Sequence, residues 1–231
     1  MTSKHGDELM ERLLLGADDG SANQLLGEIG RGYPVNRILR LTHSDVPLVV
    51  GKGAWIISEL GPRAAEMMDE VDRLLDYPVR EVRFFAVDAA LRGGTIDHAP
   101  TIAKAIMLIG DPDDAVRWKV LQLLARAPQG NLKASVPYLA DAGIGLLVRW
   151  LAGVGGDWLA GVGGDSDSAQ DVVDRLTSDD RLTRLFAAAA AARLAPTTLT
   201  PLELATASAD DEVSSYAKGE LGLPRRRPRR S

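Results

Sequence analysis

The sequence predicts an all-α protein in which short helices pair antiparallel and the pairs stack into an α-solenoid. Apolar residues recur at helical spacing, in short segments separated by glycine, proline and aspartate. Alternating β-branched stretches are absent, and aromatic residues make up only 5% of the chain. One segment also recurs along the 231 residues, and such self-similarity is typical of stacked repeats.

The recurring segment is clearest at residues 76–91 and 111–124. Each copy has an acidic or proline turn, then Val-Arg, then an apolar helix. Two-helix repeats of this kind cannot bury their apolar faces alone and must stack, which predicts about six helix pairs. Weaker copies begin at Val50, Val148, Thr183 and Val213, so that the copies counted from residues 50, 82, 116, 148, 183 and 213 start 30 to 35 residues apart.

The first helix of each pair is expected between these copies. Turns containing Gly61-Pro62 and Gly93-Gly94 separate the helices, because glycine and proline disfavour helix continuation. We expect one domain over residues 1–223, a glycine-rich insert at 153–167 and a disordered arginine-rich tail at 224–231. Helical patterning places the first helices at residues 64–75, 99–109, 133–140 and 169–176, with the first pair inside residues 5–41.

An Asp-Pro turn followed by Val-Arg and an alanine- or leucine-rich helix resembles the second helix of HEAT repeats. The resemblance extends to the short bacterial repeats related to phycobilin lyases, and it is strongest at residues 76–127. It implies an armadillo-like, right-handed superhelix whose second helices line a concave surface. Phycobilin-lyase chemistry would follow from fold analogy alone, which is a weak basis for function.

The glycine-rich insert contains an eight-residue tandem duplication. Residues 150–157 read Trp-Leu-Ala-Gly-Val-Gly-Gly-Asp, and residues 158–165 repeat them without change. No Lys-Ser or Lys-Thr follows, and the glycine spacing matches neither common phosphate-binding loop. We therefore interpret the duplication as a loop that lengthens the fourth repeat, anchored by Trp150 or Trp158.

The sequence shows no constellation typical of an active site. His5, His43 and His98 are isolated, there is no cysteine, and no Gly-x-Ser-x-Gly elbow occurs. Acidic residues at 66–72 fit the solvated face of an amphipathic helix, and those at 111–114 fit a helix N-cap. We expect a protein that is not an enzyme and that has no metal and no cofactor.

The exposed face of the second helices is the predicted binding surface. At 100° per residue, the helix from Val116 buries one arc and leaves Trp118 on the opposite one. Large aromatics flanked by arginine are enriched at interface hot spots, although packing of Phe84 and Trp118 against a neighbouring repeat is an equal alternative. Arg83 and Arg117 are expected to pair with turn aspartates or to bond carbonyls between repeats. The predicted protein-binding residues are Phe84, Asp88, Arg92, Trp118, Lys119, Gln122, Arg126, Trp150, Leu185 and Arg193.

Charge favours a protein partner over nucleic acid. The net charge is -5, and without the arginines of residues 225–231 it is -10, with 22 basic against 32 acidic residues. An acidic surface repels nucleic acid. We expect an adaptor or inhibitor, and by analogy and size an immunity protein that neutralises a basic toxin is one example. The alternative is a nucleic-acid-associated HEAT-like protein, resembling DNA glycosylases or binding DNA or RNA through a tail whose arginines are Arg225, Arg226, Arg227, Arg229 and Arg230.

A cytoplasmic location without membrane contact is expected. The absence of cysteine fits a reducing compartment. The first residues, 1–15, carry interspersed charges that do not fit a signal peptide. The longest bland apolar run, at residues 185–192, is far shorter than the roughly 20 residues that a membrane-spanning helix needs.

Overall fold

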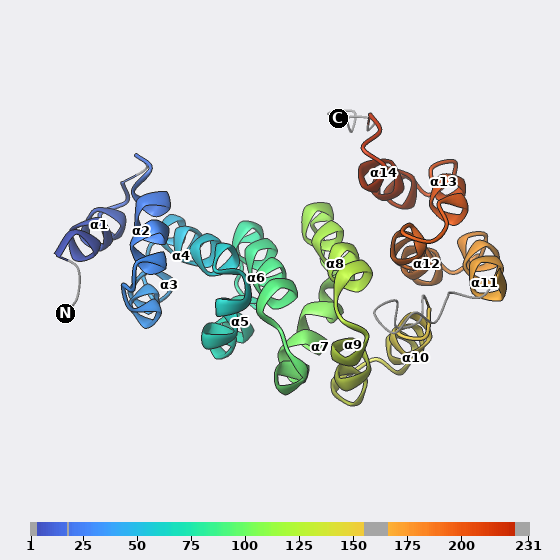
Figure 1. Cartoon of the computed structure of the whole chain (residues 1–231), viewed down its shortest axis with the longest axis horizontal. Coiled ribbons are helices and arrows are strands. Elements are labelled where there is room, and N and C mark those ends of the chain that lie inside the picture. Colours follow the sequence, from blue (N-terminus) through green and yellow to red (C-terminus); the bar gives the residue numbers. More distant parts are fainter. Residues whose placement is uncertain (1–3, 18, 155–165, 225–231) are drawn as a thin grey trace. The chain divides into compact units, whose positions relative to one another are not determined.

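Every regular segment in the described part of the chain is a helix (Figure 1). The computed structural model describes residues 4–17, 19–154 and 166–224. The prediction of an all-α protein is therefore confirmed. The chain divides into two compact units, Met1–Leu108 and Ile109–Ser231, whereas the sequence predicted one domain over 1–223. No helix in the described ranges is long and apolar enough to cross a membrane.

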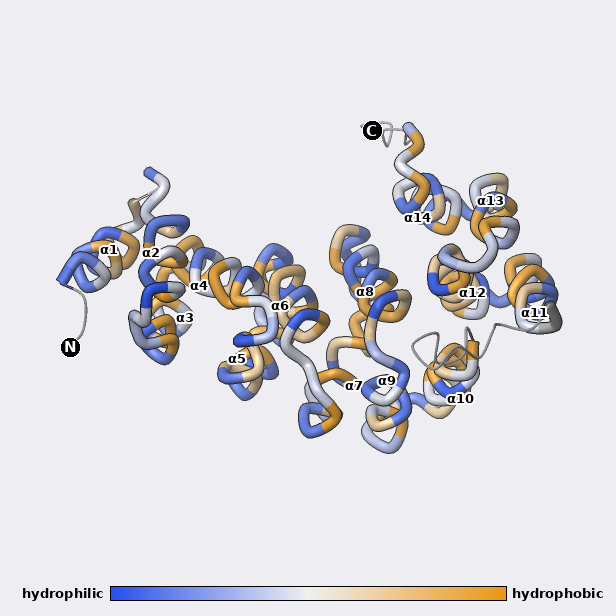
Figure 2. Tube along the Cα trace, in the orientation of Figure 1, coloured by the Kyte–Doolittle hydropathy of each residue, from blue (hydrophilic) through white to orange (hydrophobic). Residues whose placement is uncertain are grey.

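In the first unit, each helix packs on helices close to it in sequence. Helix α4 contacts α2, α3 and α6, and α6 in turn contacts α5 and α7. Hydrophobic and hydrophilic residues occupy different faces of these helices (Figure 2), as expected for amphipathic helices that bury one side. The elements are α1 (Lys4–Leu14), α2 (Ser21–Gly30), η1 (Val35–Ile38), α3 (Leu39–Thr42), α4 (Pro47–Glu59), η2 (Gly61–Met67), α5 (Met68–Leu74), α6 (Arg80–Gly93), η3 (Ile96–His98) and α7 (Ala99–Met107).

In the second unit, helix α12 lies at the centre and contacts α8, α10, α11, α13 and α14. Its residues 187–191 are all alanine and fully buried, which lets neighbouring helices approach closely. The segment η4 (Leu108–Gly110) precedes the helices of this unit. These are α8 (Asp114–Arg126), α9 (Gln129–Ser135), η5 (Val136–Tyr138), α10 (Ala142–Leu151), α11 (Ser166–Leu176), α12 (Arg181–Leu194), α13 (Thr200–Ala205) and α14 (Asp211–Glu220).

In the described part of the second unit, four helices begin at an aspartate cap. Asp113, Asp141, Asp180 and Asp210 each accept hydrogen bonds from backbone N–H groups in the first turn of α8, α10, α12 and α14. Aspartate at this position satisfies donors that have no partner within the helix. The predicted capping role of the acidic run at 111–114 is thus confirmed at Asp113.

The arginine of the Val-Arg motif binds the turn that precedes its own helix. In three copies, the Nη1 group donates to the carbonyl oxygens five and six residues earlier. The pattern confirms a carbonyl-binding role, but the carbonyls belong to the same repeat rather than to a neighbouring one. The bonds run from Arg83 to Tyr77 and Pro78, from Arg117 to Asp111 and Pro112, and from Arg184 to Ser178 and Asp179, at 2.6 to 3.0 Å.

A second set of basic side chains in the first unit links later helices to earlier ones, 31 to 36 residues before them in the sequence. Each donates to a carbonyl oxygen near the C-terminal end of an earlier helix, where backbone acceptors lack helical partners. These sequence separations are close to the 30 to 35 residues that separate the copies of the recurring segment. The bonds join Lys52 to Gly16 and Ala17, Arg63 to Ile29, Arg73 to Thr42, and Lys104 to Asp72.

Glu70 was expected on a solvated helix face but is a buried carboxylate, bound by Arg73 at 2.6 Å and His43 at 3.0 Å. Burial alone raises the pKa of the Glu70 carboxyl, but hydrogen bonds from Arg73, Thr42 and His43 together outweigh it and lower that pKa.

Glu70→Gln should therefore weaken the pH dependence of unfolding in the acid range. A carboxyl with a lowered folded-state pKa contributes stability that is present above its unfolded pKa, about 4.3, and is lost as pH falls through the folded value. Urea unfolding from pH 3 to 7 measures this, with the exposed Glu66→Gln as control. Parallel pH profiles for Glu70→Gln and the unmutated chain would contradict the prediction.

Several predicted helix positions need correction. The helix expected at 64–75 is divided into η2 and α5, and the one expected at 133–140 lies earlier, as α9 and η5. Residues 155–165, which include most of the glycine-rich insert and the second octapeptide, lie outside the described residues.

Candidate protein-binding groove

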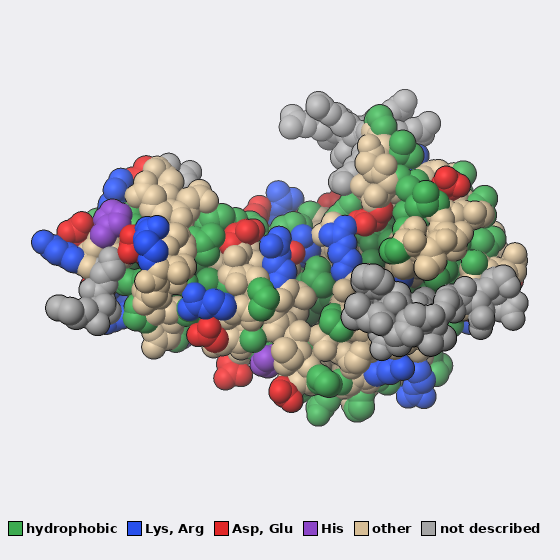
Figure 3. Space-filling view, in the orientation of Figure 1, with side chains coloured by type: hydrophobic (Ala, Val, Ile, Leu, Met, Phe, Trp, Pro, Cys, Tyr) green, Lys and Arg blue, Asp and Glu red, His purple; other side chains and the backbone are tan. Residues whose placement is uncertain are grey.

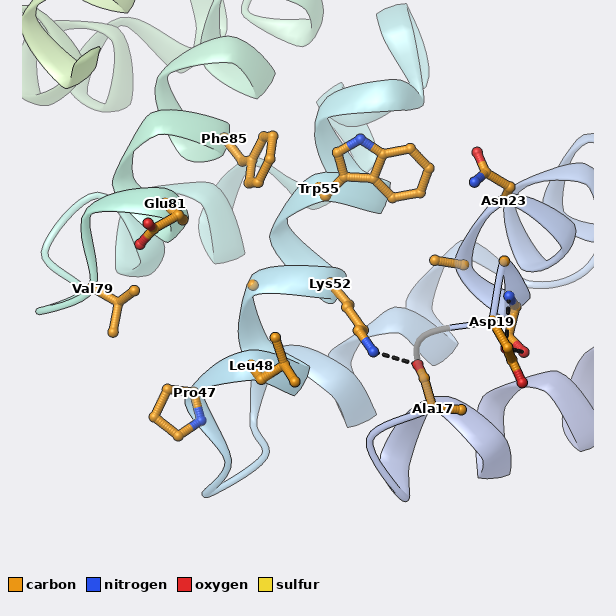
Figure 4. Close-up of a pocket in the computed structure, with 14 residues that line it drawn as sticks. Ala17, Asp19, Asn23, Pro47, Leu48, Lys52, Trp55, Val79, Glu81 and Phe85 are labelled. Carbon is orange, nitrogen blue, oxygen red and sulfur yellow. Dashed lines mark hydrogen bonds between the residues drawn. The ribbon is translucent and has the colours of Figure 1, made fainter.

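The first unit contains an open groove of about 580 Å³ bounded by the start of α2, by α4 and by α6 (Figure 4). Leu48, Lys52 and Trp55 project from α4, with Glu81 and Phe85 on α6 beside them. Asp19 and Asn23 bound the groove on the side of α2. We call this feature the α4–α6 groove.

Helix α4 gives the groove a mixed apolar and charged stripe. Leu48, Gly51, Lys52 and Trp55 lie at positions i, i+3, i+4 and i+7, which share one helix face. The opposite face is buried, as at Val49, Val50, Ile56 and Ile57, because it packs on α2, α3 and α6. Leu48 is 60% exposed, and Trp55, seven residues later on the same face, is half-buried. We call these four residues the α4 stripe.

Helix α6 supplies a second apolar wall. Phe85 lines the groove one turn after Glu81. The ring of Phe84 meets that of Phe85 edge-on, with centroids 5.4 Å apart and planes at 83°. This arrangement is a favourable one for aromatic pairs. Phe84, predicted to lie on the binding face, therefore orients the neighbouring ring that lines the groove.

The charges in the groove are held in fixed positions. The ammonium of Lys52 donates to the carbonyl oxygens of Gly16 and Ala17. Asp19 accepts from the backbone and hydroxyl of Ser21 and pairs with Arg12. Hydrogen bonding from the Ser21 side chain, together with Arg12, lowers the pKa of Asp19 to about 2, so this side chain is a carboxylate.

Gly20 sets the direction of the chain between Asp19 and helix α2. It has a φ of 83°, a left-handed conformation that glycine adopts without steric cost.

On the opposite wall of the groove, Glu81 pairs with Arg80 at 2.9 Å. Charged groups of both signs are interspersed over the face of the first unit shown in Figure 3.

Two further predicted residues of the first unit pair with each other. Asp88 is buried, and its carboxylate lies 3.0 Å from Nε of Arg92, one turn later on α6. Neither side chain lines the α4–α6 groove.

In the second unit, helix α14 packs on the predicted face of α8. The Trp118 ring meets Tyr216 edge-on at 5.1 Å, and Arg126 pairs with Glu220 at 2.9 Å. Arg117, the Val-Arg arginine, also binds Glu212 at 2.9 Å. Lys119 and Gln122, also on α8, are half-buried.

The remaining predicted residues also contact other parts of the second unit. Trp150 donates from its indole nitrogen to Asp171, and the Arg175 guanidinium lies 4.4 Å from the centroid of its ring. Leu185 is fully buried, so its predicted place on the exposed binding face was wrong. Arg193 binds backbone carbonyls of α8. The tail arginines lie outside the described residues.

The sequence-based prediction of the binding face did not include the α4 stripe, because it compared equivalent positions in the copies of the recurring segment. Counting two residues from Val82 and Val116 gives Phe84 and Trp118, but the same count from Val50 in the weak copy gives Lys52. Trp55 lies three residues further along the helix. The signal that identifies it is helical spacing within α4, which places Leu48 and Trp55 on one face.

No metal site was found in the described residues: they contain no group of three or more His, Asp or Glu side chains that could hold an ion. His98 bonds Thr95 within η3, and His43 bonds Glu70.

Comparisons with known proteins leave the family open. No family model matches the chain, and no curated protein matches it. A crystal structure of an engineered protein is similar at 18% sequence identity, over 94% of this chain and 87% of that one, with a TM-score of 0.46. A score at this level does not establish a shared fold.

Proposed function

We propose that this chain is a non-enzymatic, HEAT-like helix-repeat protein that binds another protein in the α4–α6 groove. The observation that carries the proposal is the α4 stripe, which faces the groove together with Phe85. Aromatic side chains in partly apolar concave surfaces are typical of residues that dominate binding energy.

Repeat-spaced hydrogen bonds support the solenoid part of the proposal. The bonds from Lys52, Arg63, Arg73 and Lys104 each span one repeat length, as expected if successive helix pairs stack in the same way. A second set of bonds also recurs. Arg83, Arg117 and Arg184 occupy equivalent positions in three sequence copies, and each binds the carbonyls of the turn before its own helix.

The groove chemistry favours binding over catalysis. Asp19, Ser21 and Lys52 line the groove, and each forms hydrogen bonds within the fold that involve the loop before α2. An inhibitor that blocks a toxin is one role compatible with such a surface, and the acidic net charge of -5 suits a basic target. No contact of the described residues favours nucleic-acid binding.

Leu48→Asp and Trp55→Ala should each reduce partner capture at least tenfold. Removal of a central aromatic anchor typically weakens a complex by 2 kcal/mol or more, and about 1.4 kcal/mol corresponds to tenfold. A photo-crosslinking residue at Asn23 would covalently capture the partner from cells that express the protein, and quantitative mass spectrometry would compare the variants.

Leu146→Asp is the matched control, because Leu146 is 65% exposed on α10, in the second unit. It should capture the same protein in the same amount. Equal capture by Leu48→Asp, Trp55→Ala and Leu146→Asp would show that the groove is not the binding site.

A further inference from the structure

We propose that the α4–α6 groove receives an amphipathic helix of the partner, with a large apolar side chain inserted over Gly51 and Lys or Arg residues beside it. This inference rests on the proposed function and names the chemistry of its partner. It follows from the geometry of the α4 stripe, from the glycine at its centre and from the charges of the groove.

The α4 stripe has the geometry of a socket for a side chain from another helix. When helices pack side by side, a side chain of one inserts between four residues of the other. Those four residues lie at i, i+3, i+4 and i+7, the spacing of Leu48, Gly51, Lys52 and Trp55. Leu48 and Trp55 form the apolar ends of this socket, and Phe85 of α6 extends its apolar wall (Figure 4).

Gly51 makes the socket deep, and packing within the described chain does not require a glycine there. A Cβ atom built on Gly51 would meet nothing within 4 Å. By contrast, a Cβ on Gly53, two residues later, would lie 2.7 Å from Thr42 and 3.0 Å from Leu41. Glycine destabilises a helix interior relative to alanine, so its presence at position 51 keeps open a space that an approaching side chain can fill.

The charges of the groove favour a cationic helix. Asp19 and Glu81 line it, whereas their partners Arg12 and Arg80 do not. The ammonium of Lys52 is directed to two backbone carbonyls. An incoming helix therefore meets carboxylates on both walls, and Lys or Arg flanking its apolar side chain complements them.

A displayed library of helical peptides tests the proposal with the full chain as bait. Solvent-facing positions of each peptide are fixed as Ala, Gln and Lys, and the positions of one face are randomised. Selected peptides should show large apolar residues at i, i+3 or i+4 and i+7 flanked by Lys or Arg. They should become helical on binding, as measured by circular dichroism.

Gly51→Ala and Gly51→Leu separate binding from folding. Gly51→Ala should raise Tm by about 2–4 °C, because helix propensity improves and nothing lies near the new methyl group. Gly51→Leu should fill the socket and weaken the selected peptides at least tenfold while Tm stays at or above that of the unmutated chain. Gly130→Leu, at an exposed glycine of α9 with open space around it, should leave peptide affinity unchanged.

The contrary outcomes are distinct. Peptides that are acidic or extended, or that bind Gly51→Leu as well as the unmutated chain, would overturn the helix inference even if Trp55→Ala weakens them. A dimer in sedimentation that Gly51→Leu dissociates would also overturn it, because the occupant would then be a second copy of this chain. The proposed function fails separately, if Leu48→Asp leaves capture of the native partner intact.

Discussion

Tyr216→Ala should lower the free energy of unfolding by about 3–5 kcal/mol, the range for removing a large aromatic side chain from a core. Tyr216 on α14 is fully buried and is one of the largest buried side chains in the described part of the chain. Its ring packs edge-on against Trp118, and its hydroxyl donates to the carbonyl oxygen of Leu121 at 3.2 Å. Burial raises the pKa of the hydroxyl well above its ordinary value, so the donor proton is retained at neutral pH.

Urea unfolding followed by circular dichroism measures the loss. Tyr216→Phe should cost about 1 kcal/mol, since it removes only the hydroxyl donor and leaves one carbonyl without that bond. Tyr138→Ala is the control, because Tyr138 is 58% exposed and its removal should change stability by less than about 0.5 kcal/mol. If Tyr216→Ala behaved like Tyr138→Ala, helix α14 would not be an integral part of the second unit.

Arg193→Met should lower the free energy of unfolding by about 2–4 kcal/mol. The Nη1 group of Arg193 donates to the carbonyl oxygens of Leu124, Ala125 and Ala127, at 3.1, 3.2 and 2.8 Å. These three residues are buried at the end of α8, where carbonyls have no partner within the helix. Methionine keeps much of the apolar stem but leaves the acceptors unsatisfied, and each buried unsatisfied group costs about 1–3 kcal/mol.

The matched control is Arg126→Met on α8. Arg126 is 54% exposed and pairs with Glu220, and exposed ion pairs contribute about 0–1 kcal/mol. Arg193→Lys should recover part of the loss, because its ammonium retains donors at the end of a flexible stem. Equal losses in Arg193→Met and Arg126→Met would show that the three carbonyl bonds contribute little.

Local sequence patterns predicted the helices well where the periodicity, the cap and the turn residues all lie within one copy of the recurring segment. Periodicity placed one arc of the helix from Val116 in the core, and the residues at helical spacing on that arc are all buried: Val116, Val120, Leu123, Leu124 and, just after α8, Ala127. The local sequence also predicted the turn before this helix, where Asp113 caps the helix and Arg117 binds the turn carbonyls. These interactions span few residues, so a single sequence contains the information that specifies them.

The predicted binding face depended on contacts that no local pattern specifies. Trp118 and Arg126 lie on the arc that periodicity leaves outside one repeat, but helix α14 supplies Tyr216 and Glu220 from about 95 residues away. Nothing in the segment around Trp118 indicates that partner. Leu185 was misplaced for a related reason. Helix α12 contacts five other helices of the described chain, so it buries residues that would be exposed if only the neighbouring helices in sequence packed on it.

The repeat-spaced bonds of the first unit have a direction along the chain. Lys52, Arg63, Arg73 and Lys104 all follow the carbonyls that they bind by about one repeat. During synthesis each acceptor carbonyl is therefore made before its donor, so the bond forms when the later segment is added. This order of bond formation suits vectorial, cotranslational folding from the N-terminus.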